Sequence, residues 1–215
     1  EKSIHKVYRK VASLKIQKKK VPTSLELANL ESYLGPPRFK SEDPSLKLAI
    51  GTAMGLAWTS LGGATLPIEC IKIKGKAKIQ ITGQLGKVMS ESAEIAVSFV
   101  KALINDESFW SSHTIHIHAP DGATPKDGPS AGITLSTALL SLYFDSPVKG
   151  GYAMTGEINL QGDILPIGGL REKVGAAKRL GIKKVLFPQA NLPDWERLPQ
   201  SLTKGMKPFP VANYQ

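Results

Sequence analysis

The stretch "GATPKDGPSAG", residues 122–132, places one serine, Ser130, among three glycines, two prolines and two alanines. Pro129 suits the first position of a helix, and Asp127 or Gly128 suits its cap, so the stretch predicts a loop that turns into a helix. Backbone N–H groups in the first helical turn have no partner within the helix. Ser130 is therefore expected in a first turn, beside donors that suit a developing oxyanion.

A serine hydroxyl becomes a good nucleophile only when a base takes its proton. Histidine is one choice, and "HTIHIH", residues 113–118, reads as a strand in which His116 and His118 share a face. Three interpretations stay open for this pair: hydrogen-bonded strand residues, polar support near the site, or metal ligands that still need a third partner. The sequence does not supply an evident third ligand.

Lysine is the other choice, provided that burial lowers its pKa from ~10.4 towards neutrality, since only the neutral amine accepts a proton. Lys173 lies in "LREKVGAAKRLG", residues 170–181, which reads as a helix. On a helix its neighbours at three- and four-residue spacing are apolar and mostly small: Leu170, Ala176 and Ala177. Lys178, Lys183 and Lys184 lie in more polar surroundings, so Lys173 is the best lysine candidate.

Outward from these residues, the chain alternates between strand-like and helix-like segments. Strands are expected within residues 52–60, 64–75, 77–83, 113–120, 151–160, 162–169 and 183–188. Helices are expected within residues 86–105, 129–144 and 170–181. This order predicts an α+β (mixed α/β) domain built in layers.

The N-terminal part differs from the rest. Residues 2–20 predict an amphipathic helix, and residues 21–35 predict a second helix with a capping box formed by Thr23 and Glu26. "GPPRFKSEDPS", residues 35–45, is the best linker in the chain. We therefore divide the chain into a helical segment, residues 1–40, and a main domain, residues 41–215, and expect the helical segment to end a larger helical domain.

Composition narrows the class of protein. With 215 residues, 41% hydrophobic, the chain is long enough for a packed core, and no apolar run is long enough to span a membrane. The single cysteine, Cys70, fits a reducing compartment. The net charge of +10 raises nucleic acid as a partner, but the lysines are spread over many elements, and a solvated surface or a contact with a neighbouring domain explains them as well.

The runs "TPKDGPSAG" and "AMTGEINLQGDILPIGGLREK", residues 124–132 and 153–173, resemble the proteolytic domain of Lon, an ATP-dependent AAA+ serine protease with a Ser-Lys dyad. The resemblance extends from about residue 51 to about residue 210. It implies the Lon proteolytic fold for residues 41–215, and residues 1–40 resemble the last helices of the AAA+ small α-subdomain. A final helix beyond Gln215 is also expected.

The resemblance implies that Ser130 is the nucleophile, that Lys173 is the general base and that Thr155 holds the catalytic amine. Asp127, Gly128 and Pro129 match the segment that gates the site or supplies oxyanion donors, and the donors are expected from Gly128 to Ser130. A plain helix cap remains the alternative for Asp127, and an ordinary strand residue for Thr155.

Three further residues match positions at the entrance of the active site. Trp58 and Glu69 are expected on loops there, and Glu157 on a strand where an extended substrate would pair. A packing role for Trp58 and a solvated strand position for Glu69 are the alternatives. His116 and His118 remain candidates for polar support.

The resemblance implies a hexamer that degrades misfolded, damaged and short-lived regulatory proteins, and DNA binding by the full-length protein. No metal is expected in this chain. No G-x-x-x-x-G-K-[ST] loop occurs, so ATP and Mg are expected to bind a separate ATPase domain. The alternatives are a non-proteolytic Lon-like scaffold, disfavoured by the intact Ser130 and Lys173, and a nucleic-acid-binding module. The expected location is a bacterial cytoplasm or a mitochondrial or peroxisomal matrix. No membrane is expected as a partner.

Overall fold

The computed structural model describes residues 2–21, 24–26, 29–36, 48–59, 62–120 and 125–215. The chain forms two compact units, Glu1–Glu42 and Asp43–Gln215. The boundary expected after residue 40 lies outside the described residues, as does Thr23 of the expected capping box. Assignment of the first unit to an ATPase subdomain stays a prediction.

The described part of the first unit contains two helices, α1 (Lys2–Ile16) and α2 (Leu30–Leu34). The amphipathic helix expected over residues 2–20 is present but ends at Ile16, and the second helix is shorter than expected. Lys6 Nζ donates to Leu34 O at 2.7 Å and joins the two helices. Ile4 and Ile16 on α1 are exposed, whereas the apolar residues between them, Val7, Val11 and Leu14, are half-buried.

The second unit is built on a seven-stranded sheet with the order β3-β4-β2-β1-β5-β8-β9. Its strands are β1 (Thr52–Thr59), β2 (Gly62–Lys74), β3 (Lys78–Thr82), β4 (His113–His118), β5 (Tyr152–Met154), β8 (Lys184–Pro188) and β9 (Lys207–Val211). The pairs β1–β5, β5–β8 and β8–β9 are parallel. Strand β2 is antiparallel to both of its neighbours, β1 and β4. A separate antiparallel ribbon pairs β6 (Glu157–Ile158) with β7 (Ile164–Leu165).

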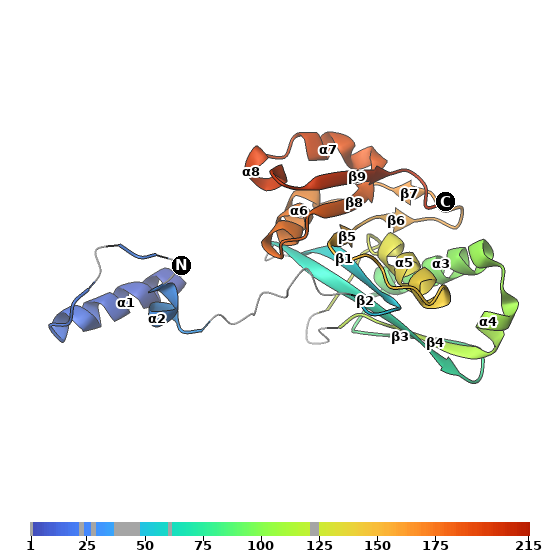
Figure 1. Ribbon diagram of the computed structural model, residues 1–215, viewed down its shortest axis with the longest axis horizontal. Coiled ribbons are helices and arrows are strands. Elements are labelled where there is room, and N and C mark those ends of the chain that lie inside the picture. Colours follow the sequence, from blue (N-terminus) through green and yellow to red (C-terminus); the bar gives the residue numbers. More distant parts are fainter. Residues whose placement is uncertain (1, 22–23, 27–28, 37–47, 60–61, 121–124) are drawn as a thin grey trace. The chain divides into compact units, whose positions relative to one another are not determined.

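Helices cover both faces of the sheet, as Figure 1 shows. On one face α3 (Lys87–Ile104) and α5 (Gly132–Tyr143) pack against each other and against a core that includes Ile68, Ile117 and Leu135. On the other face α6 (Leu170–Arg179) and α7 (Leu192–Glu196) enclose a second core around Leu56 and Phe187. The prediction of a layered α+β fold is confirmed.

The remaining elements are short: α4 (Glu107–Ser111), the 3-10 turn η2 (Gln189–Asn191) and α8 (Gln200–Thr203). The sequence analysis did not identify them, nor did it identify α7 and β9. β9 contains Pro208 and Pro210, and proline cannot donate to a sheet ladder. The strand is possible because β9 lies at the edge of the sheet, where one side has no partner strand.

Candidate active site

A cleft of about 330 Å³ lies beyond the carboxyl ends of β1 and β5, and Ser130 and Lys173 both line it. Ser130 arrives from the loop before α5, and Lys173 from the first turn of α6, so the two residues come from opposite faces of the sheet. Thr155 follows β5 directly and lies between them. Ligand sites of open α/β sheets commonly occupy this position at the carboxyl edge.

Lys173 Nζ lies 2.9 Å from Ser130 Oγ and 3.0 Å from Thr155 Oγ1. The protonated amine donates to both hydroxyl oxygens, and the neutral amine can accept the proton of Ser130. Thr155 also donates from Oγ1 to Ser130 O at 3.3 Å, and Gly156 N donates to the same carbonyl at 2.8 Å. The backbone of Ser130 is therefore held against the segment that contains Thr155, and its side chain contacts Lys173.

Lys173 is 3% exposed, and its helical neighbours Leu170, Ala176 and Ala177 are buried with it. Burial removes water from the ammonium group and lowers the pKa of Lys173 from 10.5 to about 8. This is the environment that the three- and four-residue spacing predicted. A lysine in this state can act as a proton acceptor near neutral pH.

The start of α5 was predicted incorrectly. The helix begins at Gly132 with Ala131 at its N-cap, so Ser130 lies in a turn before the helix and Pro129 is not the first helical residue. The reason lies outside the local sequence. In a helix that began at Pro129 the carbonyl of Ser130 would accept from an N–H further along α5, but Gly156 N and Thr155 Oγ1 occupy it.

Asp127 does not cap α5 either. Its Oδ1 accepts hydrogen bonds from Met89 N at 2.9 Å and Gly128 N at 2.9 Å, and it therefore satisfies a donor in the first turn of α3. Hydrogen bonds from Met89, Gly128 and Val88 lower the pKa of the Asp127 carboxyl. Gly86 makes room for it, because a Cβ at Gly86 would collide with the carboxylate. The alternative of a plain cap for the helix beside Ser130 is therefore wrong, because the carboxylate of Asp127 binds the start of α3 instead.

The backbone N–H groups expected to act as oxyanion donors differ in their hydrogen bonding. Pro129 has no N–H, and the N–H of Gly128 donates to Asp127. Among the described residues, Ser130 N has no acceptor. Of the donors expected at residues 128–130, the backbone N–H of Ser130 is therefore the remaining candidate.

Of the other expected site residues, Trp58 and Glu157 line the cleft and Glu69 does not. Trp58 is 63% exposed and packs on Gly169. Trp58 and Glu69 lie on β1 and β2, not on loops as expected. Glu69 is exposed and pairs in register with Thr52 and His118, which supports the alternative of a solvated strand residue.

His116 and His118 do share one face of β4, and both imidazoles contact the hydroxyl of Thr82 on β3. The distances to Thr82 Oγ1 are 2.8 Å from His116 Nε2 and 2.7 Å from His118 Nδ1. No hydrogen bond joins them to Ser130 or Lys173 among the residues that the structure describes. Within the same residues no cluster of three His, Cys, Asp or Glu side chains suits a metal ion.

Comparison with known proteins gives the family of the chain. A family model described as the Lon protease (S16) C-terminal proteolytic domain matches residues 24–215. The chain belongs to the Lon protease family.

Several Lon proteases are close relatives. The chain is 49% identical over 215 residues, 100% of its length, to the Lon protease of Leptospira interrogans, of which it covers 26%. The chain is 51% identical over 188 residues, 86% of its length, to the Lon protease of Lachnoclostridium phytofermentans, of which it covers 23%. Over 201 residues, 90% of its length, it is 50% identical to that of Protochlamydia amoebophila, covering 24%. The chain thus spans about a quarter of the length of these Lon relatives.

Sequence reasoning missed several residues that shape this Lon site. Gly63 brings β2 against the backbone of α6 next to Lys173, because a Cβ there would overlap the carbonyl of Glu172. Ser92 on α3 donates from Oγ to Pro129 O at 3.1 Å, next to the nucleophile. A glycine in a strand is a signal of close backbone approach, but nothing in the local pattern of α3 pointed to Ser92.

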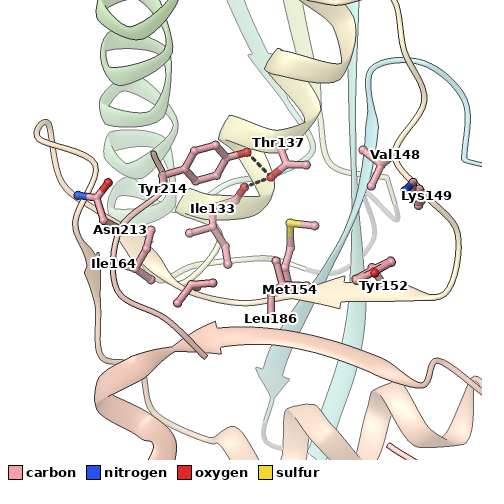
Figure 2. Close-up of a pocket in the computed structure, with 11 residues that line it drawn as sticks. Ile133, Thr137, Val148, Lys149, Tyr152, Met154, Ile164, Leu186, Asn213 and Tyr214 are labelled. Carbon is pink, nitrogen blue, oxygen red and sulfur yellow. Dashed lines mark hydrogen bonds between the residues drawn. The ribbon is translucent and has the colours of Figure 1, made fainter. Parts of the chain in front are cut away.

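The Lon domain also has an apolar cavity of about 380 Å³ that is separate from the cleft (Figure 2). Ile133, Met154 and Leu186 form part of its wall, and the hydroxyls of Thr137 and Tyr214 lie 2.6 Å apart at one side. Burial raises the pKa of Tyr214 to about 12, so its hydroxyl stays protonated. Neither Ser130 nor Lys173 is among the residues that line this cavity, which separates it from the candidate active site.

Within the described residues no helix is both long and apolar enough to cross a membrane.

Proposed function

We propose that this chain is the peptide-cleaving part of an ATP-dependent serine protease, with Ser130 as nucleophile and Lys173 as general base. The observation that carries the proposal is the contact of 2.9 Å between Ser130 Oγ and a buried lysine amine whose pKa is lowered to about 8. Membership of the Lon family supports the same reaction. Thr155 keeps the amine in place through its contact with Nζ.

The reaction then proceeds in two halves. As Ser130 Oγ attacks the peptide carbonyl carbon, its proton passes to neutral Lys173, and the carbonyl oxygen becomes an oxyanion. Collapse of this intermediate breaks the C–N bond, and the ammonium of Lys173 gives its proton to the leaving amine. Lys173 next takes a proton from water, which attacks the acyl carbon, and the proton returns to Ser130 Oγ as the acid product leaves.

The cleft suggests how a substrate would be held. The exposed face of Trp58 and the carboxylate of Glu157 line the same cleft as Ser130, together with apolar Leu66 and Met89. An apolar substrate side chain fits beside Leu66 and Met89, and Glu157 would favour a cationic group nearby. Both substrate contacts are inferred from the residues that line the cleft.

The remaining functions belong to the whole protein. We propose unfolded or damaged proteins as substrates, a homo-hexamer as the assembly and DNA as an additional partner, as the family resemblance implies. ATP and Mg are assigned to a part outside this chain, because the sequence has no G-x-x-x-x-G-K-[ST] loop to hold them. The bacterial relatives favour a bacterial cytoplasm over an organelle matrix.

The test uses the full-length protein with ATP, an unfolded casein substrate and a peptide boronate. We expect a Ser130-dependent boronate adduct by mass spectrometry, and loss of cleavage in Ser130→Ala and Lys173→Met. Lys183→Met, which alters an exposed lysine, is the matched control and should cleave normally. Cleavage that survives in both active-site variants would refute the proposal, and the absence of any cleavage in the wild type would favour the scaffold alternative.

A further inference from the structure

The peptide group between Pro129 and Ser130 is fixed from the side of α3. Pro129 O accepts a hydrogen bond from Ser92 Oγ at 3.1 Å, and a longer one from Gly132 N at 3.3 Å within the turn. Ser92 lies on α3, is 4% exposed and is 37 residues away from Pro129 in the sequence. A serine within a helix often bonds to the carbonyl of its own preceding turn, but here the hydroxyl leaves its helix to reach the nucleophile loop.

Two more contacts attach the same loop to the start of α3. Gly86 N donates to Lys126 O at 2.7 Å, and Met89 N donates to Asp127 Oδ1 at 2.9 Å. The first turns of α3 therefore hold the loop at three points along residues 126–129. Ser92 is the last of these contacts before the nucleophile.

In a trans peptide group the C=O and N–H lie in one plane and point in opposite directions, and this chain has no cis peptide among its described residues. A carbonyl held by α3 therefore turns the N–H of Ser130 away from α3. A hydrogen bond to the carbonyl also polarises the amide, which makes its N–H a stronger donor. Ser130 N has no acceptor among the described residues, so it remains available to a ligand.

We propose that Ser92 is a positioning residue that aims the backbone N–H of Ser130 at the oxyanion of the tetrahedral intermediate. The proposal rests on the proposed function, because it needs Ser130 to attack a carbonyl. Ser92 touches neither substrate nor the reacting atoms and acts only through the Pro129–Ser130 peptide. Its contribution should therefore appear where negative charge develops and not in the binding of uncharged peptide.

The test compares Ser92→Ala with the wild type in the full-length protein. We expect kcat for a fluorogenic peptide to fall about fivefold, the size expected of one neutral hydrogen bond, with KM unchanged. The inhibition constant of a peptide boronate, whose tetrahedral adduct carries the negative charge, should weaken by the same factor. The affinity for the corresponding peptide amide, which carries no negative charge at the reacting carbon, and the pH midpoint of the reaction should stay as in the wild type.

Two further variants separate positioning from packing. Ser136→Ala removes another buried hydroxyl, on α5, for which the described residues offer no hydrogen-bond partner, and it should leave kcat and boronate affinity unchanged. Ser92→Thr keeps a hydroxyl and should restore most of the lost kcat. A structural role alone would lower thermal stability in Ser92→Ala without a matched loss in kcat and boronate affinity.

The outcomes are distinct. Wild-type kinetics in Ser92→Ala, or a change confined to KM, would overturn the positioning role while Ser130-dependent cleavage in the wild type still supported the proposed function. Cleavage that does not depend on Ser130 would overturn both. Equal losses of kcat in Ser92→Ala and Ser136→Ala would also overturn the role, because they would trace the effect to general packing.

Discussion

The state of the Lys173 amine should control the pH dependence of cleavage. With a pKa of about 8, about a tenth of the amines are neutral at pH 7 and about nine-tenths at pH 9. At the ordinary value of 10.5 only about one in three thousand would be neutral at pH 7. Burial therefore increases the reactive population at pH 7 by about 300-fold.

We expect kcat/KM for a fluorogenic peptide to rise about tenfold between pH 7 and pH 9, with a midpoint near 8. The assay is a steady-state titration of the full-length protein in buffers of constant ionic strength. A midpoint near 6.5, the usual pKa of histidine, would indicate an imidazole base and would refute the assignment of Lys173. A rate that does not vary between pH 7 and pH 9 would refute it as well.

The same pKa makes a prediction about stability. Because the pKa of Lys173 is lower in the folded protein than in the unfolded chain, protonation below pH 8 opposes folding, and this penalty disappears as pH rises towards 10.5. Lys173→Met should therefore raise the free energy of unfolding at pH 7 by up to about 3 kcal/mol. The advantage should shrink between pH 8 and 10.5; a constant difference in denaturant titrations would contradict the reasoning.

Four other variants test the surroundings of the dyad. Thr155→Val removes an acceptor for Lys173 Nζ, so kcat should fall about 10- to 100-fold and the pH midpoint should move below 8; an unchanged midpoint would contradict the contact. Asp127→Asn should lower the melting temperature at neutral pH, and the difference should vanish as pH falls below 3.8, because the lowered pKa stabilises the fold only while the carboxyl is ionised. Gly63→Ala should cost about 1–3 kcal/mol in denaturant unfolding because its Cβ meets the backbone of α6. Gly175→Ala, within α6 and without a close contact, should instead stabilise by about 0.5–1 kcal/mol.

The sequence predicted those features whose causes are local. The apolar neighbours that bury Lys173 follow one another at helical spacing, so the helix and the environment of the amine could both be inferred before the structure. The strand containing His116 and His118 was equally clear from its alternation. That these two imidazoles meet at Thr82 depends on the pairing of β3 with β4, which no pattern within either strand specifies.

Other features depend on contacts between distant segments. Pro129 and Asp127 carry ordinary signals for a helix start, yet α5 starts later because the segment after β5 takes the carbonyl of Ser130. Asp127 instead accepts from Met89 N in the first turn of α3, 38 residues earlier. Glu69 was placed near the active site from a family position, but it points away from the core on an exposed position of β2. Local propensity could not anticipate these outcomes because tertiary contacts decided them.

Ser130 and Lys173 come from elements that pack on opposite faces of the sheet, and this affects how the site forms during synthesis of the chain. Ser130 belongs with the core of α3 and α5, and Lys173 with the core of α6 and α7, which is completed by residues much later in the chain. During synthesis from the N-terminus, the serine emerges well before the lysine and remains an ordinary alcohol. The proposed dyad is therefore complete only when both layers have assembled, and we expect no cutting activity from a growing polypeptide that ends before Lys173.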